Sequence, residues 1–554
     1  MELRITAKVN TDVLVIGGGA AGLRAAIEAR KIGLNVLLVS ESPVGFRNNT
    51  AISGGGFVSS SIWKGIGDSP DVHLRDTLIA GRFLNDQRLL AAITQGIKQQ
   101  VYDLMEFGVK YAEHDGELMI RQMPGHSHPR SISGEGFRSG VYITRPMRKY
   151  ADDLGVRFME GVLISKLLRT GDSVVGAMGI DDWGQICIPE ARSTILATGG
   201  AGQLYLRTNN TLGMTGDGYI LAYEVGATLR DMEFVQFYPT TWGKNGSKLC
   251  IYERFLPRGA TIRNCLGEDV LKKHGIVGFA EATRDILTRI IMKEIVAGRG
   301  TEGNVIFDLT TMPEEQVQEL YRSGLLRPNS LPDKVPVAPS AHFFIGGVKI
   351  NEDGETGING LYAAGEVSGG AHGANRLAGT ALAETFVFGA ISGDRAAGRA
   401  SKMSQISVSE SEVKAEVERL KHLASSNGGE KLDLLQKSLK QTMWDNVGVI
   451  RNEKSLGDAR KKIVVLKQQL KEVSIRDYRL LLQVIKIANM LTLSEMVYRA
   501  ALTRIETRGA HYRTDYPDEN DEQWLRTIEI SRQGGEMVLS VTPVNSDREY
   551  QKPY

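Results

Sequence analysis

The chain has 554 residues, which is too long for one ordinary domain and predicts about two to four. Hydrophobic residues make up 42% and charged residues 24%, and these values exclude a mostly disordered chain. Lys and Arg number 67 against 65 Asp and Glu, so the net charge of +2 gives no electrostatic reason to expect a nucleic acid partner.

The chain has three cysteines, Cys187, Cys250 and Cys265, and no two of them have CxxC spacing. A disulfide framework is therefore not expected, and a reducing, cytoplasmic location fits. Three cysteines cannot supply the four thiolates of an iron–sulfur cluster, and neither a CxxCH haem motif nor a cluster of metal ligands occurs, so we expect no metal site. The sequence contains no unbroken run of about 18 apolar residues, so it predicts no transmembrane segment.

Glycine is the unusual component, with 62 residues, about 11% where ~7% is usual. The first cluster follows a β-branched apolar run at 11–16, where Gly17, Gly19 and Gly22 form G-x-G-x-x-G. A helical stretch at 23–32 and a second apolar run at 35–39 come next. This strand–turn–helix–strand order is the context that a dinucleotide fingerprint requires.

Each glycine has a separate task in such a site. Gly17 allows the tight turn, Gly19 lets the backbone approach a pyrophosphate, and Gly22 lets helix and strand pack closely. Ala20 and Ala21 open the helix whose N-terminus would face the phosphates. An acidic residue is expected at the end of the second strand to bind ribose hydroxyls; this chain has Ser40 there and Glu41 directly after it, and both are candidates.

Further along the chain, the pattern predicts helix at 75–107, short strands at 163–179 and a strand at 194–197 that enters a second glycine-rich turn. After an aromatic- and Arg-rich stretch at 232–285, a third glycine-rich block covers 346–379. Helical periodicity then covers 413–423, 431–444, 456–473 and 477–505, and a closing strand is expected at 536–542.

These elements predict an α/β fold in which an inserted domain interrupts a Rossmann-like nucleotide-binding domain, with a helical domain at the C-terminal end. The expected boundaries are 1–232 for the first part of the nucleotide-binding domain, 233–345 for an α+β capping domain, 346–404 for the second part, and 405–554 for the helical domain.

Six motifs in order carry a resemblance to a known family. They cover residues 195–200, 215–218, 230–237, 361–367, 372–377 and 507–513. With them the chain resembles, over nearly its whole length, the flavoprotein subunits of succinate dehydrogenase and fumarate reductase, and L-aspartate oxidase is a close relative of these. The resemblance implies that the interrupted nucleotide-binding domain holds FAD.

The resemblance also implies which residues would hold FAD. It assigns Ala197, Thr198 and Gly199 to the adenosine side, and Asp217 and Glu366 to FAD hydroxyls. Backbone amides at Ala381 and Leu382 would face the flavin N1/O2 edge, where a helix N-terminus stabilises negative charge.

One position departs from the membrane-bound members, which attach FAD through the histidine of an Arg-Ser-His-Thr stretch. The matching stretch here is Arg47-Asn48-Asn49-Thr50. Asn49 cannot form that bond, so we expect non-covalent FAD, with Asn49, Thr50 and Gly55 in the flavin site. A non-covalent flavin has a lower potential as a rule, which favours substrate reduction over succinate oxidation.

By the same resemblance, hydride passes between flavin N5 and one carbon of the C=C bond of an enoate or dicarboxylate, and a proton goes to the other carbon. Arg284 matches the proton donor and Glu253 the relay residue. His342 and Arg376 match the pair that grips one substrate carboxylate, a task that suits the planar fork of Arg. Taken alone, Arg284 next to Asp285 also fits a helix-surface pair.

The opposite half of the expected substrate pocket departs from the family. Tyr238 stands where a histidine binds the second carboxylate, and Tyr252 replaces a threonine. The family's second relay arginine has no counterpart at the matching position of this chain, although Arg254 or Arg258 could substitute. Because Tyr offers a hydrogen bond but no cation, we expect a carboxylic acid substrate that carries something other than a plain second carboxylate.

Nothing in the chain carries electrons to a flavin, and in the family an iron–sulfur subunit docks on this subunit. The polar helical domain and the region 508–513 are the expected docking surfaces. Three alternatives stay open: a reductase of a non-fumarate enoic acid, an enzyme like L-aspartate oxidase, and a non-catalytic FAD scaffold for electron transfer.

Overall fold

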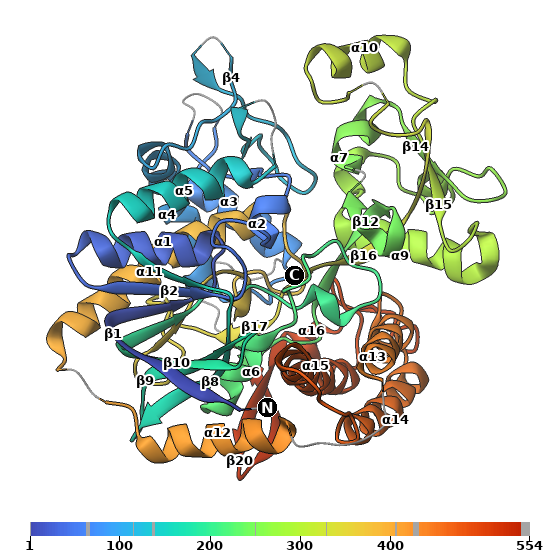
Figure 1. Cartoon of the computed structure of the whole chain (residues 1–554). Coiled ribbons are helices and arrows are strands. Elements are labelled where there is room, and N and C mark those ends of the chain that lie inside the picture. The colour runs from blue at the N-terminus through green and yellow to red at the C-terminus, as the bar shows by residue number, and fades with distance from the viewer. Residues whose placement is uncertain are drawn as a thin grey trace.

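The computed structural model of the chain describes residues 2–62, 67–114, 116–135, 139–249, 251–327, 329–404, 407–424 and 431–544. Cys250 lies outside these residues. Figure 1 shows a body built around a sheet, a smaller lobe that carries α7, α9 and α10, and a group of long helices beside the body. The α/β fold with a helical C-terminal part is confirmed.

The central sheet has seven strands in the order β7-β2-β1-β10-β9-β8, with β18 also paired to β10. Strands β1, β2, β7, β10 and β18 run parallel, while β9 is antiparallel to both of its neighbours, β10 and β8. The strands that form it are β1 (Arg4–Ile16), β2 (Val36–Ser40), β7 (Arg157–Glu160), β8 (Val162–Thr170), β9 (Ser173–Asp181), β10 (Gln185–Leu196) and β18 (Leu361–Ala363).

Helices α1 (Ala20–Lys31) and α11 (Thr380–Lys402) pack together on this sheet, with α4 (Gln87–Glu106) and α5 (Val141–Asp153) outside them. Small residues allow the close approach: a Cβ on Gly393 would lie 2.5 Å from the Ala25 carbonyl oxygen. The remaining elements of this part are α2 (Asn49–Ile52), β3 (Phe57–Val58), α3 (Pro70–Ala80), β4 (Glu113–His114), β5 (Glu117–Leu118), β6 (Ser131–Ile132) and α6 (Asp217–Glu224).

The helical pattern at 75–107 proves to be two helices, α3 and α4. Arg82 and Phe83 have φ of 55° and 60°, a left-handed conformation that ends α3. Asp86 then caps α4 by accepting from the backbone N–H of Arg88 at 3.2 Å.

Residues 235–344 form the lobe, whose five-stranded sheet has the order β13-β12-β16-β15-β14. Its core is a separate hydrophobic cluster that includes Phe255, Leu287 and Phe307. The elements are β12 (Val235–Trp242), β13 (Lys248–Leu249), α7 (Tyr252–Phe255), β14 (Thr261–Arg263), α8 (Val270–Lys273), α9 (Arg284–Glu294), β15 (Val305–Asp308), α10 (Glu314–Arg322) and β16 (Lys334–Phe344).

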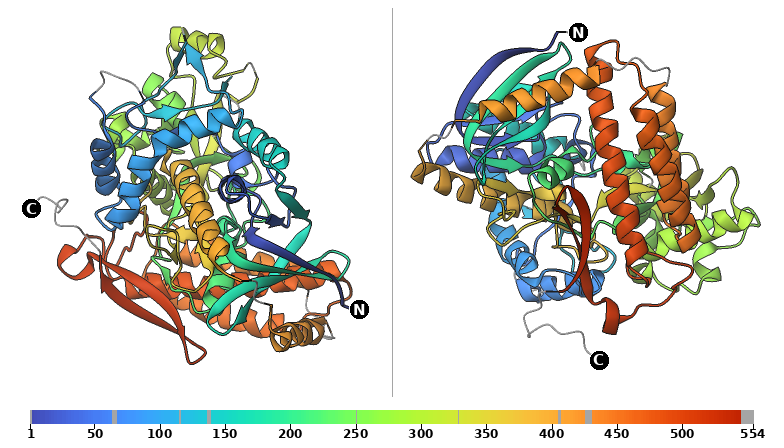
Figure 2. Two further views of the ribbon diagram at one scale, coloured as in Figure 1. Left: turned by 90° about the vertical axis from the view of Figure 1, so that its left-hand side faces the viewer. Right: turned by 90° about the horizontal axis from the view of Figure 1, so that it is seen from below.

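The C-terminal part combines helices with a hairpin. Helices α13, α14 and α15 lie side by side, and the orange and red rods of Figure 2 show them next to the dark red hairpin. That hairpin completes a sheet of order β19-β17-β11-β20-β21, so the end of the chain pairs with β11. The elements of this sheet and of the C-terminal part are β11 (Leu229–Arg230), β17 (Gly347–Lys349), β19 (Ser368–Gly369), α12 (Glu410–Ala424), α13 (Leu432–Val447), α14 (Glu453–Leu470), α15 (Tyr478–Thr503), α16 (Asp521–Trp524), β20 (Arg526–Gln533) and β21 (Glu536–Pro543). The exact domain boundaries stay a prediction.

Helix α15 is long and apolar enough to cross a membrane by length and composition alone, and among the described residues it is the one helix that is. It has 61% of its most apolar window buried against the rest of the protein. Such burial is what the core helix of a globular protein shows.

The expectation that the region 508–513 forms a docking surface is wrong for its arginines. The side chains of Arg508 and Arg513 are 0% and 1% exposed. Arg508 Nε donates to Glu506 Oε1 at 2.7 Å, and Arg504 joins Glu506 to Glu233 at 2.9 and 2.7 Å. These buried pairs fasten the C-terminal part to the start of β12 and cannot meet a partner.

Candidate active site

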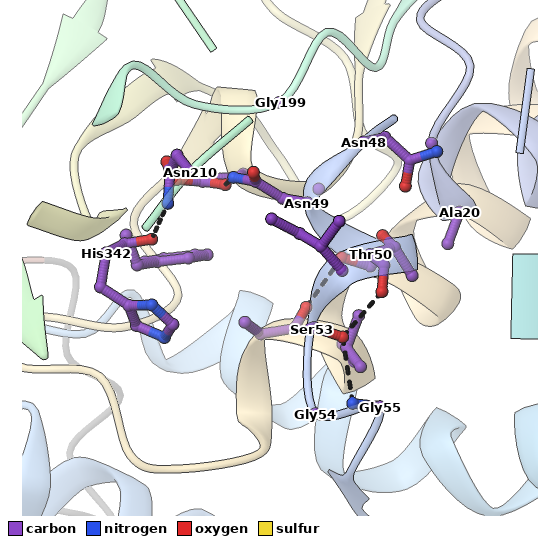
Figure 3. Close-up of a pocket in the computed structure, with 18 of the residues that line it drawn as sticks. Ala20, Asn48, Asn49, Thr50, Ser53, Gly54, Gly55, Gly199, Asn210 and His342 are labelled. Atoms are coloured by element: carbon purple, nitrogen blue, oxygen red, sulfur yellow. Dashed lines mark hydrogen bonds between the residues drawn. The ribbon is translucent and has the colours of Figure 1, made fainter. Parts of the chain in front are cut away.

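A cavity of about 840 Å³ lies between the glycine-rich turns of the body and the β12–β16 side of the lobe. Figure 3 looks into part of it and labels Asn49 and Thr50 of α2 and His342 of β16. Of the predicted site residues, Gly22 and Tyr252 do not line it. Those that do are Gly17, Gly19, Ala20, Ala21, Ser40, Glu41, Asn49, Thr50, Gly55, Ala197, Thr198, Gly199, Asp217, Tyr238, Glu253, Arg284, His342, Glu366, Arg376, Ala381 and Leu382.

The three fingerprint glycines behave differently. A Cβ on Gly17 would lie 2.1 Å from the carbonyl oxygen of Ala197, and one on Gly22 would lie 1.9 Å from the carbonyl oxygen of Gly17. A Cβ on Gly19 would meet no atom within 4 Å, and Gly19 faces the cavity. Gly17 and Gly22 are therefore required by the backbone, while Gly19 leaves space for a ligand at the N-terminus of α1. This cradle fits a dinucleotide.

Helix α15 contacts Glu41 and Asp217, two carboxylates that are predicted to bind FAD hydroxyls. Glu41, which follows Ser40 at the end of β2, forms an ion pair with Lys486. Asp217 accepts from the side-chain amide of Asn489 at 2.7 Å. Both carboxylates are thus held in place by a helix that lies far along the chain, a role for Lys486 and Asn489 that no local sequence signal indicates.

Asn49 contacts Glu366 across the cavity. Its Oδ1 accepts from the backbone N–H of Thr211 at 3.1 Å, and its Nδ2 donates to Glu366 Oε2 at 3.5 Å. The other Glu366 oxygen accepts from the backbone N–H of Phe344 at 3.0 Å. Burial raises the pKa of Glu366 to about 7 despite these donors. Asn49 therefore positions the carboxylate that is predicted to bind FAD hydroxyls.

The N-terminus of α11 opens directly onto the cavity. Gly379 has φ of +82°, so the chain turns sharply before Thr380 and directs the first helical residues, Ala381 and Leu382, at the cavity. The carbonyl oxygen of Ala378, just before this turn, is bonded to His126 Nε2 at 2.9 Å.

His126 belongs to a buried polar chain that no sequence motif indicates. Its Nδ1 lies 3.1 Å from Arg130 Nη1, and Arg130 pairs with Asp68 at 2.7 Å and Asp76 at 2.5 Å. Burial lowers the pKa of His126 to about 4, so the ring is neutral at pH 7. Since Arg130 can only donate, Nδ1 accepts and Nε2 carries the proton that bonds Ala378.

Tyr238, Glu253 and Arg284 form a connected chain on the lobe side of the cavity. The Tyr238 hydroxyl donates to Glu253 Oε2 at 2.6 Å, and Arg284 Nη2 donates to Glu253 Oε1 at 3.2 Å. Arg284 also lies over the Tyr238 ring, 5.1 Å from its centroid. Burial by itself would lower the pKa of Arg284, but Glu253, Tyr252 and Tyr238 together outweigh burial and the pKa is raised.

Gln236 joins this chain to Arg376. Its Oε1 accepts from Arg284 Nη1 at 3.2 Å and from Arg376 Nη2 at 2.8 Å. Burial, and next the charge of Arg284, lower the pKa of Arg376 to about 9. The two guanidiniums therefore line the same cavity and share the side-chain oxygen of Gln236. Gln236 lies in the family motif at 230–237, but its linking role was not predicted.

His342 faces the cavity from β16, and two asparagines hold it. Asn209 Nδ2 lies 3.0 Å from His342 Nδ1, and Asn210 donates to the His342 carbonyl oxygen at 2.9 Å, the dashed line in Figure 3. Burial, and next Arg284 and Arg376, lower the pKa of His342 well below its usual value. Asn209 Oδ1 also lies 3.2 Å from Nδ1, so the Asn209 amide engages this nitrogen and leaves Nε2 for a ligand.

One further expectation differs from what the structure shows. Tyr252 lies behind Tyr238, with ring centroids 5.8 Å apart, and does not line the cavity. The guanidinium of Arg254 donates to the Leu325 carbonyl oxygen, and Arg258 donates to the Arg254 carbonyl oxygen at 2.9 Å. Both arginines line the cavity, and a relay role for either one stays a prediction. Within the described residues, no group of three His, Cys, Asp or Glu side chains is placed to hold a metal ion.

Comparison with known proteins agrees with this geometry. Residues 12–382 match the family described as FAD binding domain, and residues 436–553 match the one described as fumarate reductase flavoprotein C-term. The chain is 36% identical to one of the subunits of fumarate reductase (CoM/CoB) from Methanothermobacter marburgensis, over 94% of this chain and 97% of that protein.

Two further similarities cover almost the full length. L-aspartate oxidase of Bacillus subtilis is 30% identical over 95% of this chain and 93% of that one. The solved structure of E. coli quinol fumarate reductase superposes with a TM-score of 0.90 at 26% identity, over 99% of both chains. The chain therefore belongs to the fumarate reductase and succinate dehydrogenase flavoprotein family, and it is an FAD-dependent oxidoreductase that acts on CH–CH bonds.

Proposed function

We propose that the chain reduces the C=C bond of an enoic acid that carries at least one carboxylate, in complex with a partner that delivers electrons. The observation that carries this proposal is the chain of hydrogen bonds from Tyr238 through Glu253, Arg284 and Gln236 to Arg376, in which every member except the linking Gln236 lines one cavity. Bound FAD supplies the hydride chemistry.

Arg376 and His342 bind the carboxylate of the substrate in this proposal. Arg376 presents a guanidinium whose charge the surrounding protein balances weakly, as its lowered pKa indicates. A substrate carboxylate supplies the missing negative charge, and the neutral His342 adds a directed N–H donor. Together they fix one end of the double bond.

Arg284 donates the proton to the carbon that does not receive hydride. An arginine is a weak acid, so it must regain its proton at once. Glu253, 3.2 Å away, is placed to return it, and Tyr238 holds the second oxygen of Glu253. Each turnover consumes one proton, so Glu253 takes up a proton from solvent through the cavity that it lines, while Tyr238 holds Glu253 in position.

We further propose that FAD is bound without a covalent link, since Asn49 is engaged with Thr211 and Glu366 and has no nucleophilic atom. The protein from Methanothermobacter marburgensis is named as a subunit. We propose that this chain likewise works with an electron-transfer subunit of the iron–sulfur kind, in the cytoplasm or at the inner membrane surface.

A second candidate function is the oxidation of an amino acid such as L-aspartate with dioxygen, favoured by the 30% identity to L-aspartate oxidase. The two functions separate in one experiment. The FAD-loaded protein is reduced with viologen without oxygen, and fumarate, crotonate and longer enoates are added in turn. Viologen oxidation with any enoate supports the reductase. Aerobic peroxide production from aspartate, with no enoate reduced, would replace it with the oxidase.

A further inference from the structure

The cavity has a group of arginines that the proposed reaction does not use. Arg121 follows β5 in the body, Arg254 lies on α7, and Arg258 lies in the turn after α7. All three line the same cavity as Arg284 and Arg376. Two separate parts of the fold thus place positive charge on one wall, and a catalytic relay does not need it.

The three guanidiniums are held in place by oxygens of the protein. Arg121 Nη2 donates to Ser133 Oγ at 2.8 Å. Arg254 donates to the Leu325 carbonyl oxygen, and Arg258 Nη1 to the Arg254 carbonyl oxygen. Arg258 also approaches Glu319 at 3.5 Å, on the outer face of the lobe. Fixed side chains of this kind form a binding site at a lower entropic cost than free ones.

The charges are also close enough to repel. Burial, and next the charge of Arg254, lower the pKa of Arg121, and Arg258 adds to the effect. A cluster of like charges in a partly buried wall is destabilising by itself, and an anion bound among them removes that repulsion.

Tyr238 explains why an anion would be bound here and not beside the double bond. A phenol has one hydrogen to donate, and that of Tyr238 goes to Glu253. A second carboxylate close to Tyr238 would receive no hydrogen bond from the phenol and would face the Glu253 carboxylate, while Arg284, which lies over the ring, is already paired with Glu253. The pocket therefore repels a second acid group at the position where a short dicarboxylate would put it.

Resting on the proposed function, we propose that Arg121, Arg254 and Arg258 bind a second anionic group at the far end of the substrate. The substrate is then an enoic acid whose first carboxylate meets Arg376 and His342 and whose chain ends in a distal carboxylate or similar oxyanion. The apolar side chains of Leu249, Ile251 and Phe279, which line the cavity near α7, would cover the carbon chain between the two acids.

The test compares acids of equal length with and without the distal charge. Binding of saturated straight-chain monoacids and diacids to the oxidised, FAD-loaded protein is followed by the change in flavin absorbance. Turnover of the matching enoates is measured with reduced viologen. We expect the long diacid to bind tighter than both the monoacid of equal length and succinate.

Variants then assign the effect to the arginines. Arg258→Gln and Arg121→Gln should each weaken binding of the diacid by about 10- to 100-fold, the usual loss for a charged hydrogen bond. The affinity for the monoacid should change less than about twofold, because the monoacid lacks the group that these arginines bind. Arg121→Lys, which keeps the charge, should recover part of the affinity and checks that the fold survives. Arg322→Gln, on the exposed side of α10, removes a charge from the same lobe outside the cavity and should change neither ligand.

Each outcome decides the matter. Equal losses for monoacid and diacid, or no preference for the diacid in the parent protein, would overturn the anion site. If diacid selectivity depends on Arg258 but no enoate is reduced, the site stands and the proposed reductase function fails. If enoates are reduced with no effect of the distal charge, the reductase stands and the site fails.

Discussion

The hydroxyl of Tyr238 donates to Glu253 at 2.6 Å, and this bond connects a β12 side chain to the proposed proton relay on α7 and α9. It gives Tyr238 a positioning role in place of a carboxylate-binding one. Glu253 has one oxygen for Arg284 and one for Tyr238, so the phenol fixes the direction in which the carboxylate meets the arginine.

Tyr238→Phe should therefore slow turnover by about tenfold, the order expected when a charged hydrogen bond is lost. The KM for the enoate should change less than kcat, because Arg376 and His342 still bind the carboxylate. Tyr205→Phe is the matched control: its hydroxyl is buried too but contacts the Val447 carbonyl oxygen at 3.4 Å and makes no bond to the relay residues. An unchanged kcat in Tyr238→Phe would remove Tyr238 from the relay.

Gly19 and Gly22 should separate cofactor binding from folding. A Cβ on Gly19 meets nothing within 4 Å, so Gly19→Ala should fold with an unchanged melting temperature in the FAD-free state but bind FAD weakly, because the methyl group fills ligand space. Gly22→Ala places its Cβ 1.9 Å from the Gly17 carbonyl oxygen and should lower the melting temperature without FAD. Thermal unfolding of both FAD-free variants, with FAD titration by fluorescence, checks this. An equal decrease in melting temperature in both variants would contradict this prediction.

Glu366 should make the stability of the FAD-free protein depend on pH. Its pKa is about 7 in the folded state against an ordinary value of 4.5, so the folded chain keeps a proton that the unfolded chain loses. The contribution of Glu366 to the free energy of unfolding is fully present below pH 4.5, falls as the pH rises toward 7, and is constant above that pH. Glu366→Gln stays neutral, so between these pH values it should gain about 1 to 3 kcal/mol relative to the parent. Urea unfolding at pH 5 and 7.5 measures the difference, and a pH-independent difference would contradict the shift.

His126 should affect the flavin through Ala378. Removing the ring in His126→Ala frees the Ala378 carbonyl oxygen and loosens the turn at Gly379 that opens α11. FAD should bind about tenfold more weakly, and its potential should shift, because the α11 N-terminus stabilises reduced flavin less well. The matched control is His128→Ala, which removes the neighbouring histidine of the same loop, bonded to Ser127. Equal effects of both variants would indicate general loosening of the loop.

Acid precipitation should release all the yellow colour into the supernatant, because Asn49 cannot bond to the flavin. The colour is measured by absorbance in the supernatant and in the washed pellet. Flavin that stays with the pellet after washing would contradict the non-covalent proposal.

The sequence predicted the central features of the fold because they are local. The βαβ unit around residues 17–22 follows from a strand pattern, a turn and a helix in immediate succession. The break between α3 and α4 was missed, since the positive φ values of Arg82 and Phe83 have no residue signature there. Local patterns carry no information on such conformations.

The site was predicted residue by residue only where a family motif covers it. Gln236, Asn209 and His126 were missed as site residues because their roles depend on partners more than 100 positions away. The error over Arg508 and Arg513 has another cause, since their partners Glu506 and Asp515 lie only two positions away. Arginines in a polar segment favour a surface position, and only the folded chain shows that these pairs are buried inside the protein.

The pairing of β11 with β20 has a consequence for how the chain is made. Leu229 lies opposite Ile530, so these two paired strands are 301 positions apart in the chain (530 − 229). During synthesis β11 emerges from the ribosome long before its neighbour exists, and an unpaired strand edge is prone to wrong associations. The nascent chain must keep that edge protected until synthesis is nearly finished, so premature termination anywhere between β17 and β20 leaves a product with an open sheet.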